Sequence, residues 1–137
     1  YYDSDIQSYT SSSYTAKVAG NQIPDSPEWI AKGALTYKLG NWSFTPTAKY
    51  VDDRYGDVEN TQTIPAYVLV DFDVAYTAKK LLGSKEAIFR LTMTNLTNQK
   101  YVSSIVTPDN ALSANTTQTS YQTGAPFGAY LSANFKF

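Results

Sequence analysis

The fold is decided at the end of the chain, where residues 127–137 read FGAYLSANFKF. Apolar and polar side chains alternate along this stretch. Successive side chains of a β-strand point to opposite faces, so the alternation predicts a strand with one apolar and one polar face. The apolar face would carry Phe127, Ala129, Leu131, Ala133, Phe135 and Phe137. The polar face would carry Gly128, Tyr130, Ser132, Asn134 and Lys136.

The same pattern recurs in four earlier segments, which are residues 29–38, 42–52, 66–78 and 86–96. We expect each to be a strand, and we expect residues 1–4 to complete another. These segments are about 10–13 residues long, whereas strands of soluble domains cluster near about 5–6 residues. About 9–11 tilted residues cross the hydrocarbon core of a bilayer. Strand length therefore favours an all-β, antiparallel transmembrane β-barrel, represented here by about five full strands.

The connections between the predicted strands alternate in length. Residues 5–28, 53–65 and 97–126 are long, while residues 39–41 and 79–85 are short. Outer-membrane barrels have short periplasmic turns and longer extracellular loops. If residue 137 lies at the periplasmic rim, strand parity places both short turns on the periplasmic side.

Aromatic residues gather near the strand ends of the predicted apolar face. The ends toward the short turns carry Tyr37, Trp42, Phe44, Tyr76, Phe89, Phe135 and Phe137. The opposite ends carry Trp29, Tyr50 and Phe127. Small or aliphatic residues lie between them. This distribution is typical of the two aromatic girdles around the apolar band of a membrane barrel.

Composition excludes most other functions. The net charge is −1, with 11 basic and 12 acidic residues along the chain, which argues against nucleic acid as a partner. The sequence has no Cys and no His, so it lacks a thiol nucleophile, the commonest general base and the commonest transition-metal ligand. We therefore expect neither an enzyme nor a cofactor.

We expect neither a helical membrane segment nor a signal peptide within residues 1–137. No run of about 18 apolar residues is present. The first two residues are Tyr, without an initiator Met or the basic and apolar segments of a signal peptide. We expect the chain to be processed or to be part of a longer protein.

Several segments resemble the C-terminal portion of TonB-dependent outer-membrane receptors. The first are NQIPDSPEW at residues 21–29, YVDDRYGD at 50–57 and TIPAY at 63–67, followed by the strand with Asp71. The later ones are Asn95-Leu96 with Lys100-Tyr101, GAPF at 124–127 and SANFKF at 132–137. The resemblance covers nearly the whole chain, in the family's order and spacing. Thr97 departs from the Phe or Asp common near its position.

The resemblance implies a function as well as a fold. The complete protein would enclose an N-terminal plug in a barrel of about 22 strands. It would take up a scarce ligand, often a ferric siderophore, with energy delivered through TonB. The plug and the TonB-contacting segment are not in residues 1–137. About five strands cannot close a barrel, and lipid does not tolerate an open sheet edge, so we expect no transport by this chain alone.

Charged side chains on the predicted polar face form one group of candidate functional residues. In a barrel they would face the lumen and hydrogen-bond the plug, whereas on a surface sheet they would only be solvated. The group comprises Lys32, Lys38, Lys49, Asp71, Asp73 and Arg90. Two carboxylates on one face can act as an acid–base pair, but without His we expect no catalysis here.

The long connections supply a second group. In the family, loop aromatic residues often contact ligand, and Tyr offers rigid amphipathic surface, although the same residues can pack one loop against another. The candidates are Asp53, Arg54, Tyr55, Tyr101 and Tyr121. The carboxylates at 52, 53 and 57 lack the spacing of a calcium loop, so we expect a hydrated loop and no metal.

Phe137 resembles the terminal aromatic residue by which outer-membrane proteins are recognised for insertion, and it also suits a girdle. The implied partners are outer-membrane lipid, the plug of the same protein, TonB through the N-terminal part, the barrel-assembly machinery and a ligand such as a ferric siderophore. The implied location is the outer membrane of a Gram-negative bacterium.

Two other functions remain open on the sequence. One is another outer-membrane barrel, such as a porin or an autotransporter translocator, and the other is a soluble β-sandwich that binds carbohydrate. Alternation alone suits a sandwich equally well. Strand length, loop rhythm and aromatic placement favour the membrane barrel, and an upstream plug would distinguish a receptor from other barrels. The transported ligand is not identified by these residues.

Overall fold

The computed structural model describes residues 10–11, 14–15, 19–106 and 120–137. No helix long and apolar enough to cross a membrane occurs among them. The chain divides into two compact units. The loop unit comprises Tyr1–Ile30, Tyr50–Tyr67 and Lys100–Gly124, and the sheet unit comprises Ala31–Lys49, Val68–Gln99 and Ala125–Phe137.

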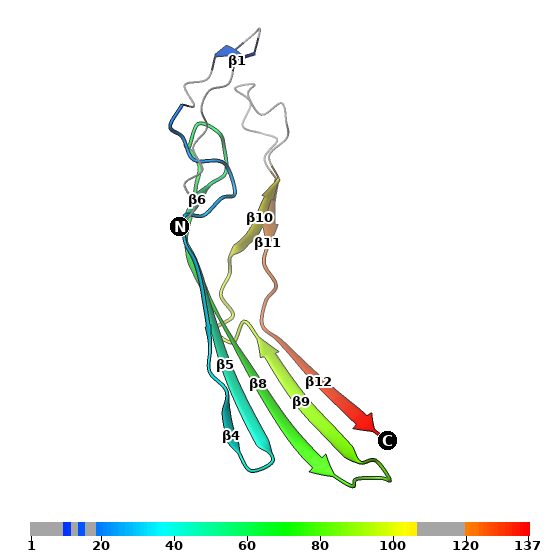
Figure 1. Cartoon of the computed structure of the whole chain (residues 1–137). Coiled ribbons are helices and arrows are strands. Elements are labelled where there is room, and N and C mark those ends of the chain that lie inside the picture. The colour runs from blue at the N-terminus through cyan, green and yellow to red at the C-terminus, as the bar shows by residue number, and fades with distance from the viewer. Residues whose placement is uncertain (1–9, 12–13, 16–18, 107–119) are drawn as a thin grey trace. The chain divides into compact units, whose positions relative to one another are not determined.

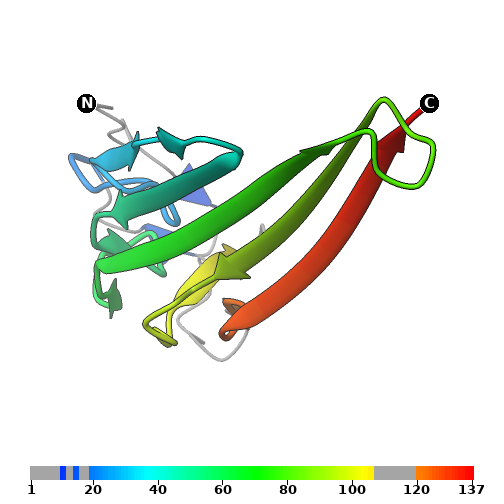
Figure 2. The ribbon, with the colours of Figure 1, turned by 90° about the horizontal axis from the view of Figure 1, so that it is seen from below.

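One six-stranded sheet has the order β12-β9-β8-β5-β3, with β4 paired to β5 (Figure 1). Its strands are β3 (Ile30–Ala34), β4 (Tyr37–Leu39), β5 (Trp42–Val51), β8 (Tyr67–Lys79), β9 (Glu86–Thr94) and β12 (Gly128–Lys136). Figure 2 shows β8, β9 and β12 side by side, and these pairings are antiparallel. The predicted all-β antiparallel fold is confirmed. The strand expected at residues 1–4 lies outside the described residues.

Strand register gathers the predicted apolar residues into common rows. Across β8, β9 and β12 the apolar rows are Phe72 with Met93 and Ala129, Val74 with Leu91 and Leu131, and Tyr76 with Phe89 and Ala133. The rows between them are Asp73 with Thr92 and Tyr130, and Ala75 with Arg90 and Ser132. A slip of one residue would move a whole strand's apolar set to the other face. The register therefore gives the sheet one apolar and one polar face, as the alternation predicts.

The segment predicted as one strand at residues 29–38 is divided in the structure into β3 and β4. Pro46 of β5 explains the division. The Leu35 amide donates to the Pro46 carbonyl at 3.2 Å, but proline has no N–H to return the bond. The register continues across the gap, since the Thr36 and Thr45 hydroxyls lie 3.0 Å apart.

Both short connections are turns at one end of the sheet (Figure 1). Gly40 and Asn41 join β4 to β5, and Leu39, predicted in the turn, is the last residue of β4, opposite Trp42. Gly40 has φ +59°, a left-handed conformation that favours glycine in two-residue hairpins. Residues 80–85 join β8 to β9, where the Ser84 hydroxyl donates to the Leu81 carbonyl at 2.5 Å. The two predicted short turns are confirmed.

Aromatic rings near these turns contact one another on the apolar face. The centroid of Trp42 lies 4.8 Å from that of Tyr76 and 6.2 Å from that of Phe44. Phe89 and Phe135 meet edge to face at 6.0 Å. Such pairs add about 0.5–1.5 kcal/mol beyond the burial of area. The rings predicted to form one girdle thus join β5 to β8 and β9 to β12.

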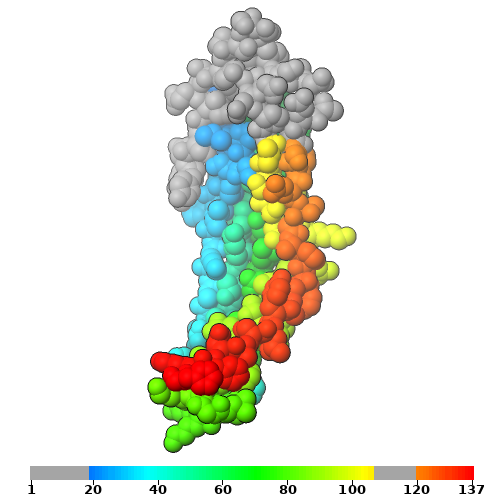
Figure 3. Space-filling model, turned by 90° about the vertical axis from the view of Figure 1, so that its right-hand side faces the viewer, coloured from blue at the N-terminus to red at the C-terminus, as the bar shows by residue number. Residues whose placement is uncertain are grey.

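The apolar face of the sheet has no protein layer over it in the described part of the chain. Leu131 is 78% exposed, Leu35 72% and Phe137 77%, and Figure 3 shows β12 uncovered. Within the sheet unit, the buried apolar side chains that the structure describes are only Ala75 and Ala87. Soluble proteins rarely expose large contiguous apolar patches. We therefore expect an apolar partner to cover this face.

The long connections contain short strands that the sequence patterns did not indicate. β6 (Arg54–Tyr55) pairs with β7 (Thr63–Ile64), β10 (Val102–Val106) with β11 (Ser120–Thr123), and β1 (Thr10–Ser11) with β2 (Tyr14–Thr15). Residues 53–65 and 97–126, expected as loops, are therefore hairpins in part. Strands of two residues are too short for alternation to reveal, and the register of β10 with β11 shifts between Val102 and Ser104.

The sequence predicts that the apolar face meets lipid in an outer membrane, and on that prediction Leu131→Lys should reduce the amount of folded, complete protein there. A Lys on a lipid-facing strand position near the bilayer midplane costs about 2–4 kcal/mol. The matched control is Ser132→Lys, which adds the same charge to the polar face of the same strand. Heat-modifiable gel mobility of the outer-membrane fraction measures folding, and equal levels of both variants would contradict the assignment of the faces.

Candidate functional site

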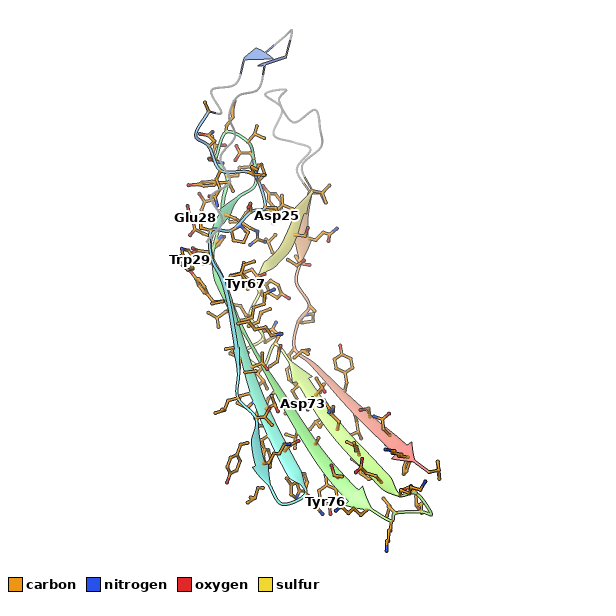
Figure 4. All side chains as sticks on the ribbon, in the orientation of Figure 1. Asp25, Glu28, Trp29, Tyr67, Asp73 and Tyr76 are labelled. Carbon is orange, nitrogen blue, oxygen red and sulfur yellow. The ribbon has the colours of Figure 1, made fainter. Side chains whose placement is uncertain are left out.

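An ion pair occupies the polar face of the sheet. Arg90 Nη1 lies 3.4 Å from Asp73 Oδ1, and the Thr92 hydroxyl donates to Asp73 Oδ2 at 2.6 Å. Arg90 and Thr92 alternate along β9 next to Asp73 of β8, labelled in Figure 4, so the contacts follow from register. The Arg90 side chain is half exposed, which limits such a pair to about 1 kcal/mol or less. Two of the six candidates on this face thus neutralise each other.

Asp71 holds the end of β9. Its Oδ1 accepts from the Asn95 amide at 2.9 Å. Asn95 is 4% exposed, with φ +50°, and its side-chain oxygen accepts from the Gln99 amide at 2.8 Å. Its side-chain nitrogen donates to the carbonyls of Gln99 and Ala125, both at 2.9 Å. A buried asparagine therefore ties the chain after β9 to the segment before β12.

Three lysines of the polar face have no ion-pair partner among the described residues. Lys32 on β3 and Lys38 on β4 are exposed, and Lys49 on β5 is half-buried. Lys38 lies opposite Ser43. The bond from the Leu35 amide to the Pro46 carbonyl belongs to the same register and places Lys32 opposite Lys49. That these lysines line a barrel lumen stays a prediction.

A buried ion pair organises the loop unit. Arg54 is 2% exposed, and its Nε lies 2.6 Å from Asp25 Oδ1. Its Nη2 donates to the Val102 carbonyl at 2.8 Å, and its guanidinium carbon lies 5.8 Å from the centroid of the Tyr67 ring. The Tyr101 ring packs against Tyr67 at 4.5 Å. These five residues are called the Arg54 cluster, and Figure 4 labels Asp25 and Tyr67.

Asp25 connects β6 to β10. Its Oδ2 accepts from the Ile105 amide at 3.0 Å and from the Ser104 hydroxyl at 3.3 Å. Its own amide donates to the Tyr55 carbonyl at 2.9 Å. Within the described part of the chain, Nη1 of Arg54 is buried without a hydrogen-bond partner. Arg54 therefore lies inside the unit, which corrects the prediction from sequence that it is a loop residue available to a ligand.

Carboxylates of residues 52–57 are engaged by the protein itself. Asp57 accepts from the Thr61 hydroxyl at 2.5 Å, the Thr61 amide at 3.2 Å and the Gln62 amide at 2.9 Å. The Tyr50 hydroxyl donates to Asp52 at 2.6 Å and thereby lowers the pKa of Asp52. No group of three acidic, His or Cys residues in the described chain is arranged to hold a metal ion.

The remaining loop candidates differ in exposure. Asp53 is exposed, and Tyr55 is half-buried in β6. Tyr121 of β11 is 41% exposed, and its hydroxyl donates to Gln62. Tyr101 is half-buried, and a β-carbon at Gly124 would overlap its ring. Tyr101 thus packs one loop segment against another, and Asp53 and Tyr121 keep exposed side chains. Ligand contact by any of them stays a prediction.

Phe137 follows β12, beside the turn that joins β8 to β9. Its carbonyl accepts from Lys85 Nζ at 3.3 Å, and the Lys136 carbonyl accepts from the Lys85 amide at 2.8 Å. The turn therefore holds the end of β12 through one lysine. A role of Phe137 in barrel assembly stays a prediction.

Asp25, Tyr67 and Asn95 were not predicted from the sequence to have a functional role. All three lie within the segments that carry the family resemblance, which was the available signal. The ion pair of Asp25 with Arg54 joins residues 29 positions apart. Alternation reports only on neighbours along a strand, so it does not reveal such a pair.

Comparison with known proteins finds one family. A model described as "TonB dependent receptor-like, beta-barrel" matches residues 1–98. The "Probable TonB-dependent siderophore receptor PiuA" of Acinetobacter baumannii is 35% identical over 83 residues, which are 60% of this chain and 10% of that protein. The chain thus spans about a tenth of the length of the curated relative that it matches.

Solved structures show the same fold. The siderophore receptor PiuA from Acinetobacter baumannii has a TM-score of 0.72 at 28% identity, covering 88% of this chain and 15% of that one. The unliganded ferric citrate transporter FecA has a TM-score of 0.72 at 23% identity, and the match covers 88% of this chain and 18% of FecA. BauA, the ferric preacinetobactin receptor from Acinetobacter baumannii, has a TM-score of 0.63 at 24% identity, and the match covers 88% of this chain and 16% of BauA. The likenesses to FecA and BauA carry the fold alone.

We expect Asp25→Ala to loosen the loop unit. Removing one partner of a buried ion pair costs about 3–5 kcal/mol, because the other charge stays buried without compensation. Hydrogen exchange of the Ile105 amide in the complete protein should accelerate at least about 100-fold, since a tenfold change corresponds to about 1.4 kcal/mol. Glu28→Ala, which removes an exposed carboxylate of the same segment, is the control. Equal exchange in both variants would exclude a stabilising role for the cluster.

Proposed function

We propose, from the premise that this chain belongs to the family of TonB-dependent receptor β-barrels, that residues 1–137 form part of an outer-membrane receptor for uptake of a scarce ligand. The family consists of receptors and transporters rather than enzymes, and its barrels reside in the outer membrane of Gram-negative bacteria. Because the chain belongs to this family, the alternative functions left open by the sequence (a porin, an autotransporter translocator or a carbohydrate-binding sandwich) are no longer proposed.

One observation carries the proposal, which is the pair of opposite faces of the six-stranded sheet. The apolar face is uncovered and has aromatic rings in contact near the short turns. The polar face carries an ion pair and lysines. A barrel wall in a membrane has an apolar band outside and a polar interior. The sheet therefore suits a wall with lipid on one side and water or protein on the other.

The name of one similar protein supports an iron chelate as the ligand class. PiuA is named a siderophore receptor. Uptake of a ferric siderophore or a similar chelate is therefore the proposed activity. The plug and the segment that contacts TonB belong to the rest of the complete protein, in this proposal, and residues 1–137 are the C-terminal portion of its barrel.

The candidate residues take roles from this arrangement. The polar face with Lys32, Lys38 and Lys49 faces the lumen and the plug, and the long connections lie on the extracellular side. There Asp53 and Tyr121, both exposed, are the proposed ligand contacts. Arg54 and Tyr101 act indirectly, by holding the loop unit together.

Deletion of the gene for the complete protein should abolish most TonB-dependent uptake of its cognate labelled ferric siderophore by iron-starved cells. Restoring the gene should restore uptake, and cells without TonB should show none. The measurement is cell-associated iron over time for a panel of ferric siderophores. Uptake that continues unchanged for every siderophore after deletion would contradict the proposed function.

Phe137→Ser should lower the amount of assembled receptor, because the terminal aromatic of the barrel is the proposed recognition point for insertion. The expected result is a several-fold drop in heat-modifiable protein in the outer membrane. Phe135→Ser, which removes an aromatic of the same face two residues earlier, is the control for girdle packing. Equal losses in both variants would favour a simple girdle role for Phe137.

A further inference from the structure

We propose that the turn between β8 and β9 binds the headgroup of an anionic phospholipid in the periplasmic leaflet of the outer membrane. The binding residues are Lys80 and Lys85, and the group they bind is a negatively charged glycerophosphate diester. This inference rests on the proposed function, because it requires the apolar face of the sheet to meet lipid and the short turns to lie on the periplasmic side. The surface concerned takes no part in uptake.

Lysines are concentrated at this turn. Lys79 of β8 and Lys136 of β12 lie on either side of Glu86 of β9 in one register row. Lys80 and Lys85 follow in the turn, where the Lys80 amide donates to the Lys85 carbonyl at 3.3 Å. The side chains of these lysines are all exposed. Four lysines therefore share a single carboxylate, which leaves an excess of positive charge.

The other short turn carries much less charge. Residues 37–44, which include the turn at Gly40 and Asn41, contain Lys38 as their only charged residue. Both turns lie at the same end of the sheet (Figure 1). The concentration of lysines is therefore a property of one turn, and the position at this end of the sheet does not by itself account for it.

The backbone of the turn fixes the positions of its side chains. The amide and the hydroxyl of the buried Ser84 both donate to the Leu81 carbonyl, at 2.9 and 2.5 Å. The Lys85 amide donates to the Lys136 carbonyl at 2.8 Å, and Figure 2 shows the turn beside the end of β12. Lys85 Nζ donates to the Phe137 carbonyl at 3.3 Å. Since an ammonium group has three donors, two remain for a ligand.

Two side chains of the turn sit on a backbone conformation that residues with a β-carbon rarely adopt. The φ angles of Lys80 and Leu82 are +57° and +50°, in the left-handed region that is disfavoured for such residues. Gly40 has this conformation in the other turn. A turn that only reversed the chain would favour Gly or Asn at such positions. Such outliers cluster where side chains have a function, so Lys80 and the 81% exposed Leu82 point to a partner.

The lysines lie within reach of the lipid headgroups. The ring of Tyr76 on β8 contacts Trp42 in the girdle near the short turns, and girdle aromatics lie at the headgroup level. Lys80 follows Tyr76 by four residues, which advance about 10 Å along the membrane normal in a strand tilted by about 45°. A lysine stem can extend back along the apolar surface while its ammonium stays in the polar layer. The ammonium group of Lys80 can therefore reach a lipid phosphate.

A phospholipid suits this turn better than a soluble polyanion does. A soluble polyanion offers charge alone, whereas lysines beside an exposed leucine are the combination by which amphipathic segments bind an anionic membrane surface. Each lysine close to such a surface strengthens binding roughly fivefold. Lys80 and Lys85 together therefore predict a preference of roughly 25-fold for an anionic over a neutral lipid.

Native mass spectrometry of the complete receptor in a neutral detergent tests this inference. Titrations with dioleoyl phosphatidylglycerol and dioleoyl phosphatidylcholine compare two headgroups on the same acyl chains. The wild-type protein should bind phosphatidylglycerol at least about tenfold more tightly. Lys80→Gln with Lys85→Gln should lose most of this preference, whereas Lys80→Arg with Lys85→Arg, which retains both charges, should keep it.

The matched control is Lys32→Gln with Lys38→Gln, which removes the same charge from β3 and β4 and should keep the preference. Equal affinity of the wild-type protein for both lipids, or equal losses in the control and in the variant of the turn, would overturn the inference. Displacement of the lipid by equimolar glycerol phosphate would also overturn it, by indicating a site for free phosphate. So would a loss of binding to peptidoglycan alone, by indicating a periplasmic polymer.

A measurement on the wild-type protein covers the case in which the glutamine variant does not fold. In lipid nanodiscs, acetylation of Lys80 and Lys85 should be slower with phosphatidylglycerol than with phosphatidylcholine, and the rate at Lys38 should be the same in both. Equal rates at Lys80 and Lys85 in the two lipids would contradict the inference. Siderophore uptake by cells reports on the proposed function separately, since the lipid preference is measured without ligand or TonB.

Discussion

A bilayer core offers no hydrogen-bond partners, so every backbone amide and carbonyl that meets it must be bonded within the protein. The long antiparallel ladders of β5, β8, β9 and β12 meet this requirement along their paired edges. β12 and β3 form the two edges of the sheet, and in lipid those edges require further strands. The ladder loses a bond at Pro46, which has no N–H, and both short turns contain residues with positive φ, Gly40 in one and Gly83 in the other.

Register converts this ladder into two faces with different chemistry. Register places Leu131, Leu91 and Val74 in one row, so the side chains of the neighbouring rows point to the opposite, polar face. Asp73, Arg90 and Thr92 therefore contact one another as a direct result of strand pairing. The position of each charge is therefore a consequence of pairing. Lys32 and Lys49 are brought opposite each other in the same way.

The loop unit depends on a different interaction. Its short strands have two to five residues, and a buried ion pair with its hydrogen bonds lies beside the buried apolar side chains Val51, Ile64, Tyr67 and Ile105. Arg54, Asp25 and the backbone of Val102 and Ile105 join segments that lie far apart in the chain. Such a network tolerates little change, because each buried polar group that loses its partner carries a desolvation penalty.

The sequence by itself determined the long strands of the sheet, its two faces and its short turns, because alternation and turn residues act between neighbours along the chain. The sequence also indicated the family, because several of its segments occur in the family's order and spacing, and the family match confirms this prediction. Only the tertiary structure decided that Arg54 is buried against Asp25, that Tyr101 packs on Tyr67, and that residues 97–126 contain a hairpin. These contacts join residues far apart in sequence, and which distant groups meet depends on register and chain path rather than on any local pattern.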